Sequence, residues 1–455
     1  MKKILMLSYY FPPITDVGGL RALGFAENLP AHGWEPHVLS VRNPDRSVCG
    51  VGDGGPPAGI DTRYCRSLFH LNRASWKANG VLRLLLRAVG IRLRGNIVHE
   101  LFCLPDVFAG WIVPAYAAGL RIMKQEGIDL IYVSSKPFSS TLAGVLLKKA
   151  TGKPLVLDFR DPASFPDSLF MDNRAGRTRK RIIGRIERYV LENADALLTT
   201  TRATEEAYLE RYPFLAGRTR TIYNGFYLPG IPMQAVEPFD VFTIVYMGNF
   251  YHDLVPSDTF FEALRAVVDQ GRIPADRIRF LYVGGLRGKD NWLMEAGRRH
   301  QVSHLIRTAG QVSREEAQSI LARSALMLLR IVPPMISTKL FEGLRDGVPM
   351  LAIIEEGEVA ELIRVYSPRS YVVTSHRAGD AADAICEAYR RWEKGELTPQ
   401  IHTEYRNRFN KKSLTAAFRE VLEAVIDNPR DERLLPLGSH KPGFEPRSVE
   451  RHANH

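Results

Sequence analysis

Residues 325–354, ALMLLRIVPPMISTKLFEGLRDGVPMLAII, contain the local pattern that decides the fold. Two short apolar runs, at 325–329 and 349–354, flank a segment of helical period at 337–346, with Pro and Gly at the connections. This order predicts a strand, a helix and a second parallel strand, the unit that builds sheets covered on both faces. We therefore expect an α/β fold.

The same alternation extends outward through most of the chain. Further strands are predicted at 3–8, 35–41, 130–134, 155–159, 196–200, 220–223, 242–247 and 279–283, with helices between them. Residues 226–240 (FYLPGIPMQAVEPFD) contain three prolines and little periodicity, which marks a break between two series. We predict two Rossmann-like, doubly wound domains that face each other across a cleft: residues 1–225, a hinge at 226–240, residues 241–400, a closing helix at 401–427 and a disordered tail at 428–455.

The composition is that of a globular chain with a basic surface. The 455 residues are 45% apolar, and 61 Lys and Arg against 50 Asp and Glu give a formal charge of +11. A chain of this length is too long for a single hydrophobic core. Its positive charge indicates phosphate-rich partners: nucleic acid, anionic lipid or small phosphorylated ligands. Because the basic residues are dispersed and no aromatic and basic platform is present, we do not expect a nucleic-acid partner.

Cysteine usage and hydropathy predict a cytoplasmic protein. The four cysteines lack C-x-x-C spacing, which argues against a disulfide framework and a zinc site. The apolar run after Met1 is too short for a signal peptide, and residues 107–120 fall short of the ~20 residues that cross a bilayer.

Residues 79–100, NGVLRLLLRAVGIRLRGNIVHE, predict a basic amphipathic helix. Leucines and valines gather near one face, and Arg83, Arg87, Arg92 and Arg94 surround them. Such a helix either packs on its own domain with a solvated basic rim or lies in the interface of an anionic membrane. The second alternative makes the protein peripheral on the inner face of the plasma membrane.

Glycines and charged residues follow the predicted strands of the first domain, at the sheet edge where α/β proteins bind ligands. Gly18 and Gly19 precede a helix, so they allow an anion to approach its N-terminus, or they form a tight turn without a ligand. Asp158, Arg160 and Asp161 end the strand at 155–159. They form either a structural ion-pair turn or a catalytic group in which Arg160 meets phosphate charge and one aspartate orients a hydroxyl.

The helix at 337–346 offers a diphosphate site in the second domain. Ser337 or Thr338 is expected to cap the helix, whose first N–H groups and Lys339 would hold a diphosphate. Glu342, one turn further on, can accept hydrogen bonds from both hydroxyls of a ribose. A capped surface helix without a ligand is the alternative.

Together these motifs resemble those of the family 4 glycosyltransferases, retaining hexosyltransferase-like enzymes of GT-B fold that build bacterial surface polysaccharides and glycolipids. The resemblance covers about residues 1–425. It rests on YYFPPITDVGGLRA, SSKPFSS to LVLDFRDP, ENADALLTTT, YNGF, and STKLFEGLRDGVPMLAI followed by EEGEVAELI. It implies a nucleotide-sugar donor, expected to be UDP-linked, in the second domain and a lipid-linked, oligosaccharide or polysaccharide acceptor in the first. No metal and no cofactor are expected.

The resemblance also assigns residues. Around the donor it places Ser337, Thr338 and Lys339 at the helix start, Glu342 on the ribose, Gly18 and Gly19 from the opposite domain, and Gly248, Asn249 and Glu358 beside the nucleotide. Near the acceptor, Arg160 stands where many relatives have an active-site histidine, and Asp161 follows it.

Two departures from the family pattern concern the donor. Pro334 stands eight positions before Glu342, where members often carry a glutamate that contacts the donor sugar. The stretch 248–255 supplies only His252 where relatives place a basic residue, so Lys339 and Arg160 are expected to neutralise the leaving diphosphate. A non-catalytic GT-B scaffold in a polysaccharide assembly complex, or a nucleotide-sugar epimerase, are the alternative functions.

Overall fold

The computed structural model describes the chain from residue 1 to 427 with short gaps. The residues that it leaves out are 17, 53, 56, 91, 93–94, 166–169, 229–236, 249, 251–257, 286–291, 332–335 and 428–455. Most of the predicted hinge and all of the predicted tail therefore lie outside the described residues.

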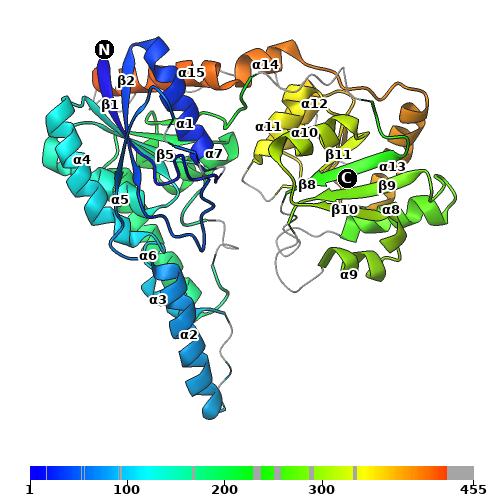
Figure 1. The fold of residues 1–455 in the computed structure, drawn as a ribbon, viewed down its shortest axis with the longest axis horizontal. Coiled ribbons are helices and arrows are strands. Elements are labelled where there is room, and N and C mark those ends of the chain that lie inside the picture. The colour runs from blue at the N-terminus through cyan, green and yellow to red at the C-terminus, as the bar shows by residue number, and fades with distance from the viewer. Residues whose placement is uncertain are drawn as a thin grey trace, which may run out of the picture.

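The first sheet has seven described strands, all parallel, in the order β3-β2-β1-β4-β5-β6-β7 (Figure 1). They are β1 (Lys2–Leu7), β2 (Trp34–Val41), β3 (Asp61–Cys65), β4 (Leu130–Ser135), β5 (Leu155–Phe159), β6 (Ala196–Thr199) and β7 (Thr219–Thr221). The helices between them are α1 (Gly19–Asn28), α2 (Leu71–Ala88), α3 (Ile97–Phe102), α4 (Ile112–Glu126), α5 (Ser139–Thr151), α6 (Arg174–Glu192) and α7 (Arg202–Arg211).

The second sheet has six described strands, also parallel, in the order β10-β9-β8-β11-β12-β13. They are β8 (Phe242–Met247), β9 (Ile278–Val283), β10 (Ile306–Gly310), β11 (Leu326–Leu329), β12 (Met350–Ile353) and β13 (Tyr371–Val373). The later helices are α8 (Asp258–Asp269), α9 (Trp292–Arg299), α10 (Arg314–Arg323), α11 (Thr338–Asp346), α12 (Glu358–Tyr366), α13 (Ala378–Glu393), α14 (Thr403–Phe409) and α15 (Lys411–Asp427).

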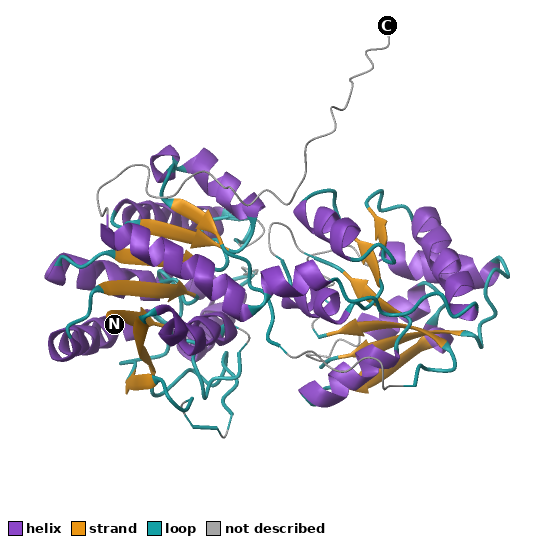
Figure 2. Cartoon of the chain, turned by 90° about the horizontal axis from the view of Figure 1, so that it is seen from above, coloured by secondary structure: helices purple, strands orange, loops and turns teal. Residues whose placement is uncertain are grey.

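Each sheet is apolar on both faces, as the short apolar runs of the sequence require. In β1, Leu5 and Leu7 join a hydrophobic cluster with α4 and α5, whereas Ile4 and Met6 join another with α1 and α15. Figure 2 shows helices on both sides of the strands in each lobe. The predicted α/β class with two doubly wound domains is confirmed.

The strands that the sequence analysis did not predict are β3, β10 and β13, and all three lie at sheet edges. An edge strand has a neighbour on one side only and is less buried than a central strand, so polar side chains are tolerated and interrupt its apolar run. Residues 307–309 of β10, for example, are exposed.

The last helix returns to the first domain. Phe418 of α15 stacks on Phe25 of α1 with ring centroids 4.4 Å apart. The returning chain runs beside the outgoing one, since the Phe226 N–H donates to the Phe409 carbonyl (3.2 Å) and the Lys411 N–H donates to the Phe226 carbonyl (2.9 Å). The two connections between the domains are thus hydrogen-bonded to each other.

The amphipathic helix expected at 79–100 has different bounds. The helix α2 begins earlier, at Leu71, and ends at Ala88, and α3 follows as a separate short helix. Gly90 (φ +80°) takes the left-handed backbone that ends α2, and Gly95 (φ +71°) takes it in the turn before α3. Figure 1 shows α2 projecting from the body of the first domain as an arm. Among the described residues, no helix combines the length and hydrophobicity needed to span a membrane.

Candidate active site

The first part of the candidate site lies where β8, β11 and α11 meet. Ser337 caps α11, and its Oγ accepts a hydrogen bond from the Lys339 N–H at 3.3 Å, which confirms the predicted N-cap. Ser337, Thr338, Lys339 and Glu342 are all half-buried, so the helix start is not sealed inside the protein. Its free N–H groups and the helix dipole favour an anion at this point.

Lys339 reaches from α11 to the carboxyl end of β8. Its Nζ lies 4.5 Å from the centre of the Tyr246 ring and 3.4 Å from the Tyr246 hydroxyl. A Cβ on Gly248 (φ +79°) would lie 3.3 Å from the same nitrogen, so a glycine leaves room for the ammonium against the backbone. The predicted site residues Gly248 and Lys339 are therefore neighbours. Asn249 lies outside the described residues.

Arg330 is a second cation here that the sequence analysis did not identify. It directly follows β11, is buried, donates from Nη1 to the Phe250 carbonyl (3.0 Å) and lies 4.0 Å from the centre of the Phe250 ring. Burial lowers the pKa of Arg330 to about 10. Its position directly after a buried strand is the sequence signal that could have identified Arg330 as a site residue.

Burial, and next the charge of Arg330, lower the pKa of Lys339 to about 8, although the charge of Glu342 opposes the shift. An anion placed beside these two cations and the start of α11 would raise that pKa again, because it favours the charged ammonium. The arrangement can therefore accommodate an anion such as a phosphate or diphosphate. Glu342, one helical turn along, is close enough to affect Lys339 and belongs to the same site.

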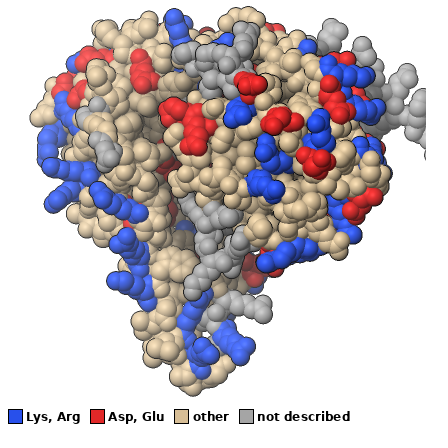
Figure 3. All heavy atoms as spheres, turned by 45° about the vertical axis from the view of Figure 1, so that its right-hand side comes forward, with Lys and Arg blue, Asp and Glu red and all other residues tan. Residues whose placement is uncertain are grey.

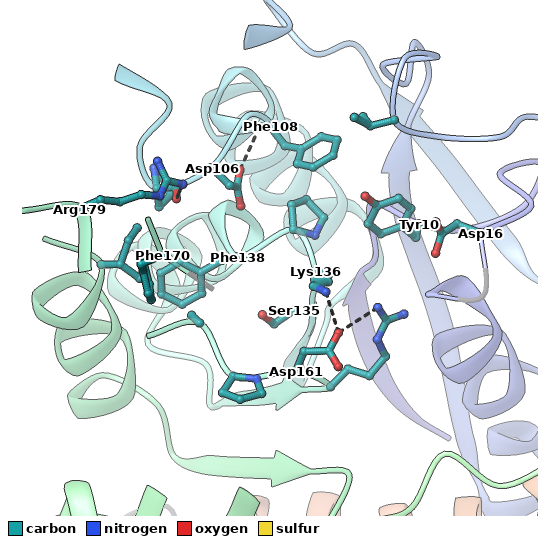
Figure 4. Close-up of a pocket in the computed structure, with 17 residues that line it drawn as sticks. Tyr10, Asp16, Asp106, Phe108, Ser135, Lys136, Phe138, Asp161, Phe170 and Arg179 are labelled. Atoms are coloured by element: carbon teal, nitrogen blue, oxygen red, sulfur yellow. Dashed lines mark hydrogen bonds and ion pairs between the residues drawn. The ribbon is translucent and has the colours of Figure 1, made fainter. Parts of the chain in front are cut away.

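The first domain contributes a pocket of about 440 Å³ at the carboxyl ends of β1, β4 and β5 (Figure 4). Its wall combines aromatic side chains with charged residues of both signs. The aromatic side chains are Tyr10, Phe108, Phe138 and Phe170, and the charged ones are Asp16, Asp106, Lys136, Arg160, Asp161 and Arg179. Apolar walls with a few polar groups are typical of sites for small organic ligands.

Asp161 lies at the wall of this pocket between two cations (Figure 4). Its Oδ2 is 2.9 Å from Lys136 Nζ and 3.1 Å from Arg160 Nη2. Burial alone would raise the pKa of the Asp161 carboxyl, but the charges of Arg160 and Lys136 outweigh it and hold the pKa below its usual range. Asp161 is thus a carboxylate that can accept a hydrogen bond from a hydroxyl.

Gly18 and Gly19 lie at the start of α1, beside this pocket. A Cβ on Gly18 would lie 2.5 Å from Arg160 Nη1, and one on Gly19 would lie 2.6 Å from the Tyr10 carbonyl. Gly18 therefore lets the loop approach Arg160, and Gly19 lets it approach the Tyr10 backbone. The structure brings Gly18, Arg160 and Asp161 together. Lys136, like Arg330, is a charged residue after a strand that the sequence analysis did not single out.

Asp158, predicted as a catalytic residue, is completely buried and points to the other face of β5. Its Oδ2 accepts hydrogen bonds from Arg21 Nε (2.6 Å) and from the Tyr132 hydroxyl. The sequence analysis did not predict this pair, since its ion-pair alternative joined Asp158 to Arg160 and not to Arg21. The pair keeps the Asp158 carboxylate away from the pocket.

Glu358, which the resemblance places beside the nucleotide, contacts residues of the first domain. Its carboxylate accepts hydrogen bonds from the N–H and Nε of Arg202, at 3.1 and 3.2 Å, and from the Tyr223 hydroxyl. Because these first-domain groups cover it, the Glu358 side chain is only 8% exposed.

One cluster of possible metal ligands lies within the described residues: His37, Asp61 and Glu126. Arg63 already forms ion pairs with both carboxylates. The cluster also lies away from the residues of the candidate site, so it does not bear on this chemistry.

Comparisons with known proteins cover most of the chain. The family profile "Glycosyl transferase 4-like domain" matches residues 18–225, and "Glycosyl transferases group 1" matches residues 241–391. No curated protein matches the chain.

Several solved structures share the fold over more than nine-tenths of the chain. Sucrose-phosphate synthase from Thermosynechococcus elongatus has a TM-score of 0.61 at 16% identity and covers 94% of this chain and 100% of its own. A glycosyltransferase from Rickettsia africae has a TM-score of 0.57 at 14% identity, covering 94% and 99%. HepE of Anabaena, solved with UDP and glucose, has a TM-score of 0.55 at 14% identity, covering 93% and 100%.

Proposed function

Because this chain belongs to the GT-B glycosyltransferases of the family 4 type, we propose that it transfers a hexose from a UDP-linked donor to an acceptor hydroxyl, with retention at the anomeric carbon. The second domain holds the donor and the pocket of the first domain holds the acceptor. The acceptor is a lipid-linked saccharide or a growing polysaccharide of the cell envelope. The protein works at the inner face of the plasma membrane.

The observation that carries this proposal is the pair of cations beside the start of α11. Arg330 is buried and Lys339 is half-buried, and burial together with the charge of Arg330 lowers the pKa of Lys339 to about 8. Leaving-group departure puts negative charge on the diphosphate, and preorganised cations in a closed site stabilise that charge. They take the place of the basic residue that relatives carry after the Gly-x-Phe/Tyr turn.

Glu342 and the glycines complete the donor site in this proposal. Glu342 accepts hydrogen bonds from the ribose hydroxyls, and Ser337 and Thr338 present the N–H groups of α11 to the diphosphate. Gly18 and Gly19 allow the first domain to approach the phosphates from the opposite side.

The acceptor hydroxyl is positioned by Asp161, and Arg160 shares the diphosphate charge. In the transfer, the bond between the anomeric carbon and the diphosphate oxygen breaks while the acceptor oxygen bonds to that carbon on the same face. The hydroxyl proton passes to the leaving phosphate. Asp161 is a poor proton acceptor because two cations lower its pKa, so it acts as a positioning residue.

Calorimetric titration of the full chain with UDP-, GDP- and ADP-sugars tests the proposal. We expect one nucleotide class to bind, and Lys339→Met to weaken that binding at least tenfold. No binding of any nucleotide-sugar contradicts the donor site. Turnover of the bound donor by the isolated protein distinguishes an enzyme from a non-catalytic scaffold.

A further inference from the structure

The arm α2 carries a stripe of exposed apolar side chains. The helix has 18 residues, about 27 Å in length. Val81, Leu84, Leu85 and Val89 follow at the spacing of one helix face and are between 59% and 71% exposed. Ser75 and Asn79 are buried on another face of α2, and this face is the one that packs on α3. The apolar stripe is therefore the outer surface of the arm.

The same arm is uniformly basic. Residues 71–96 contain no Asp or Glu, and their charged side chains are Arg73, Lys77, Arg83, Arg87, Arg92 and Arg94. Figure 3 shows Lys and Arg side chains on the tapering end of the molecule, where the arm projects. An exposed stripe of leucines flanked by arginines is unlike an ordinary solvated helix, which places polar residues outward.

A second basic surface lies on α6, beside the arm. Half of the residues that line a groove of about 960 Å³ are cations, and Asp172 is its one acidic lining residue. The cations are Arg177, Lys180, Arg181, Arg185, Arg188 and Arg211. Residues 173–186 contain no Asp or Glu. The short helix α3 connects α6 with the arm, and the buried Arg179 of α6 donates to the carbonyls of His99 (3.0 Å) and Cys103 (2.9 Å) at the end of α3. The two surfaces are thus held in one unit.

We propose that the arm α2 and the basic groove of α6 dock the protein on a bilayer of anionic phospholipid. The apolar stripe enters the boundary between headgroups and acyl chains, and the arginines of α2 and α6 contact lipid phosphates. The proposal deepens the membrane location given under the proposed function, and it does not depend on the transfer reaction.

Charge complementarity favours this occupant over the others. A soluble polyanion would pair with the cations but would leave Leu84 and Leu85 in water. A second copy of the chain would bring the same cations against each other. An anionic bilayer offers both an apolar phase and a continuous negative surface.

Flotation of the full chain with vesicles tests the proposal without any nucleotide-sugar. We expect binding to phosphatidylcholine vesicles that contain about a third phosphatidylglycerol, weaker binding at high salt, and little binding to pure phosphatidylcholine. Leu84→Glu should reduce vesicle partitioning at least tenfold, and Arg181→Glu with Arg185→Glu should reduce it several-fold. The matched controls are Ile401→Glu and Arg298→Glu, which change exposed residues of the second domain.

Three outcomes overturn the proposal. The wild-type chain does not bind anionic vesicles, the Leu84→Glu variant binds them as well as the wild type does, or the control variants lose as much vesicle binding as the test variants. Dissociation of a dimer by Leu84→Glu, with no vesicle binding by the wild type, would assign the stripe to a second copy. UDP binding by the same variants is expected to stay unchanged. That measurement separates failure of docking from failure of the donor site.

Discussion

Arg21 Nε lies 2.6 Å from Asp158 Oδ2, and both side chains are almost completely buried. Arg21 Nη1 also donates to the carbonyls of Ile222 (2.7 Å) and Tyr223 (2.9 Å), so one guanidinium connects α1, β5 and the chain that leaves β7. This ion pair holds the first domain together at the point where the chain leaves for the second.

We predict that Asp158→Ala destabilises the protein strongly. Removing one partner of a buried ion pair leaves the other charge buried and uncompensated, which costs about 3–5 kcal/mol. Urea denaturation of both forms measures this loss. Asp161→Ala is the matched control: its partners Arg160 and Lys136 reach water, so its free energy of unfolding should fall much less. Equal losses for the two variants contradict the structural role of Asp158.

Lys339 should make donor binding depend on pH. With a pKa of about 8, Lys339 is charged below that pH and becomes neutral above it. Because the diphosphate favours the charged form, UDP affinity should fall about tenfold between pH 7 and pH 9. Titration calorimetry at both values measures the change. Lys339→Arg, which keeps its charge, should remove most of the pH dependence, and a wild-type affinity that is flat up to pH 9 argues against this site.

Glu342 should contribute to binding of the nucleoside part of UDP and not to binding of its phosphates. We expect Glu342→Ala to weaken UDP binding about tenfold or more, because both ribose hydroxyls lose their acceptor. Binding of inorganic pyrophosphate should persist, since a negative charge near Lys339 is removed. Calorimetry with both ligands tests this, with Glu295→Ala on the exposed face of α9 as the control. If pyrophosphate and UDP weaken together, Glu342 has another role.

Asp161→Asn should slow transfer without weakening donor binding. The carboxylate positions the acceptor, so kcat should fall by about tenfold to a hundredfold while the Kd for UDP stays constant. A radiolabelled transfer assay and calorimetry give the two values. A change in the Kd alone would place Asp161 on the donor instead.

Much of the fold follows from local sequence pattern. The predictions for β5 at 155–159 and β8 at 242–247 match the structure at both ends, since their apolar runs are buried on both faces and bounded by turn residues. The cap at Ser337 was also predictable, because capping depends on neighbours within one helical turn.

The roles of the charged residues could not be predicted from local sequence pattern. Asp158 and Asp161 are only three positions apart, but Asp158 forms a buried ion pair and Asp161 lies at the pocket wall. The partner of Asp158, Arg21, is 137 residues away in the sequence. Glu358 likewise depends on Arg202, which is 156 residues distant and in the other domain. Only the tertiary structure brings these partners together.

The return of α15 to the first domain has a consequence for synthesis. Phe418, Val421, Leu422 and Val425 belong to the same hydrophobic cluster as Ile4 and Phe25. A ribosome must therefore release nearly the whole chain before the domain made first can complete its core. Until then α1 packs on this face of the first sheet without α15, and the apolar side chains that α15 covers stay exposed to solvent. Truncation before α15 should yield aggregated protein rather than a folded first domain.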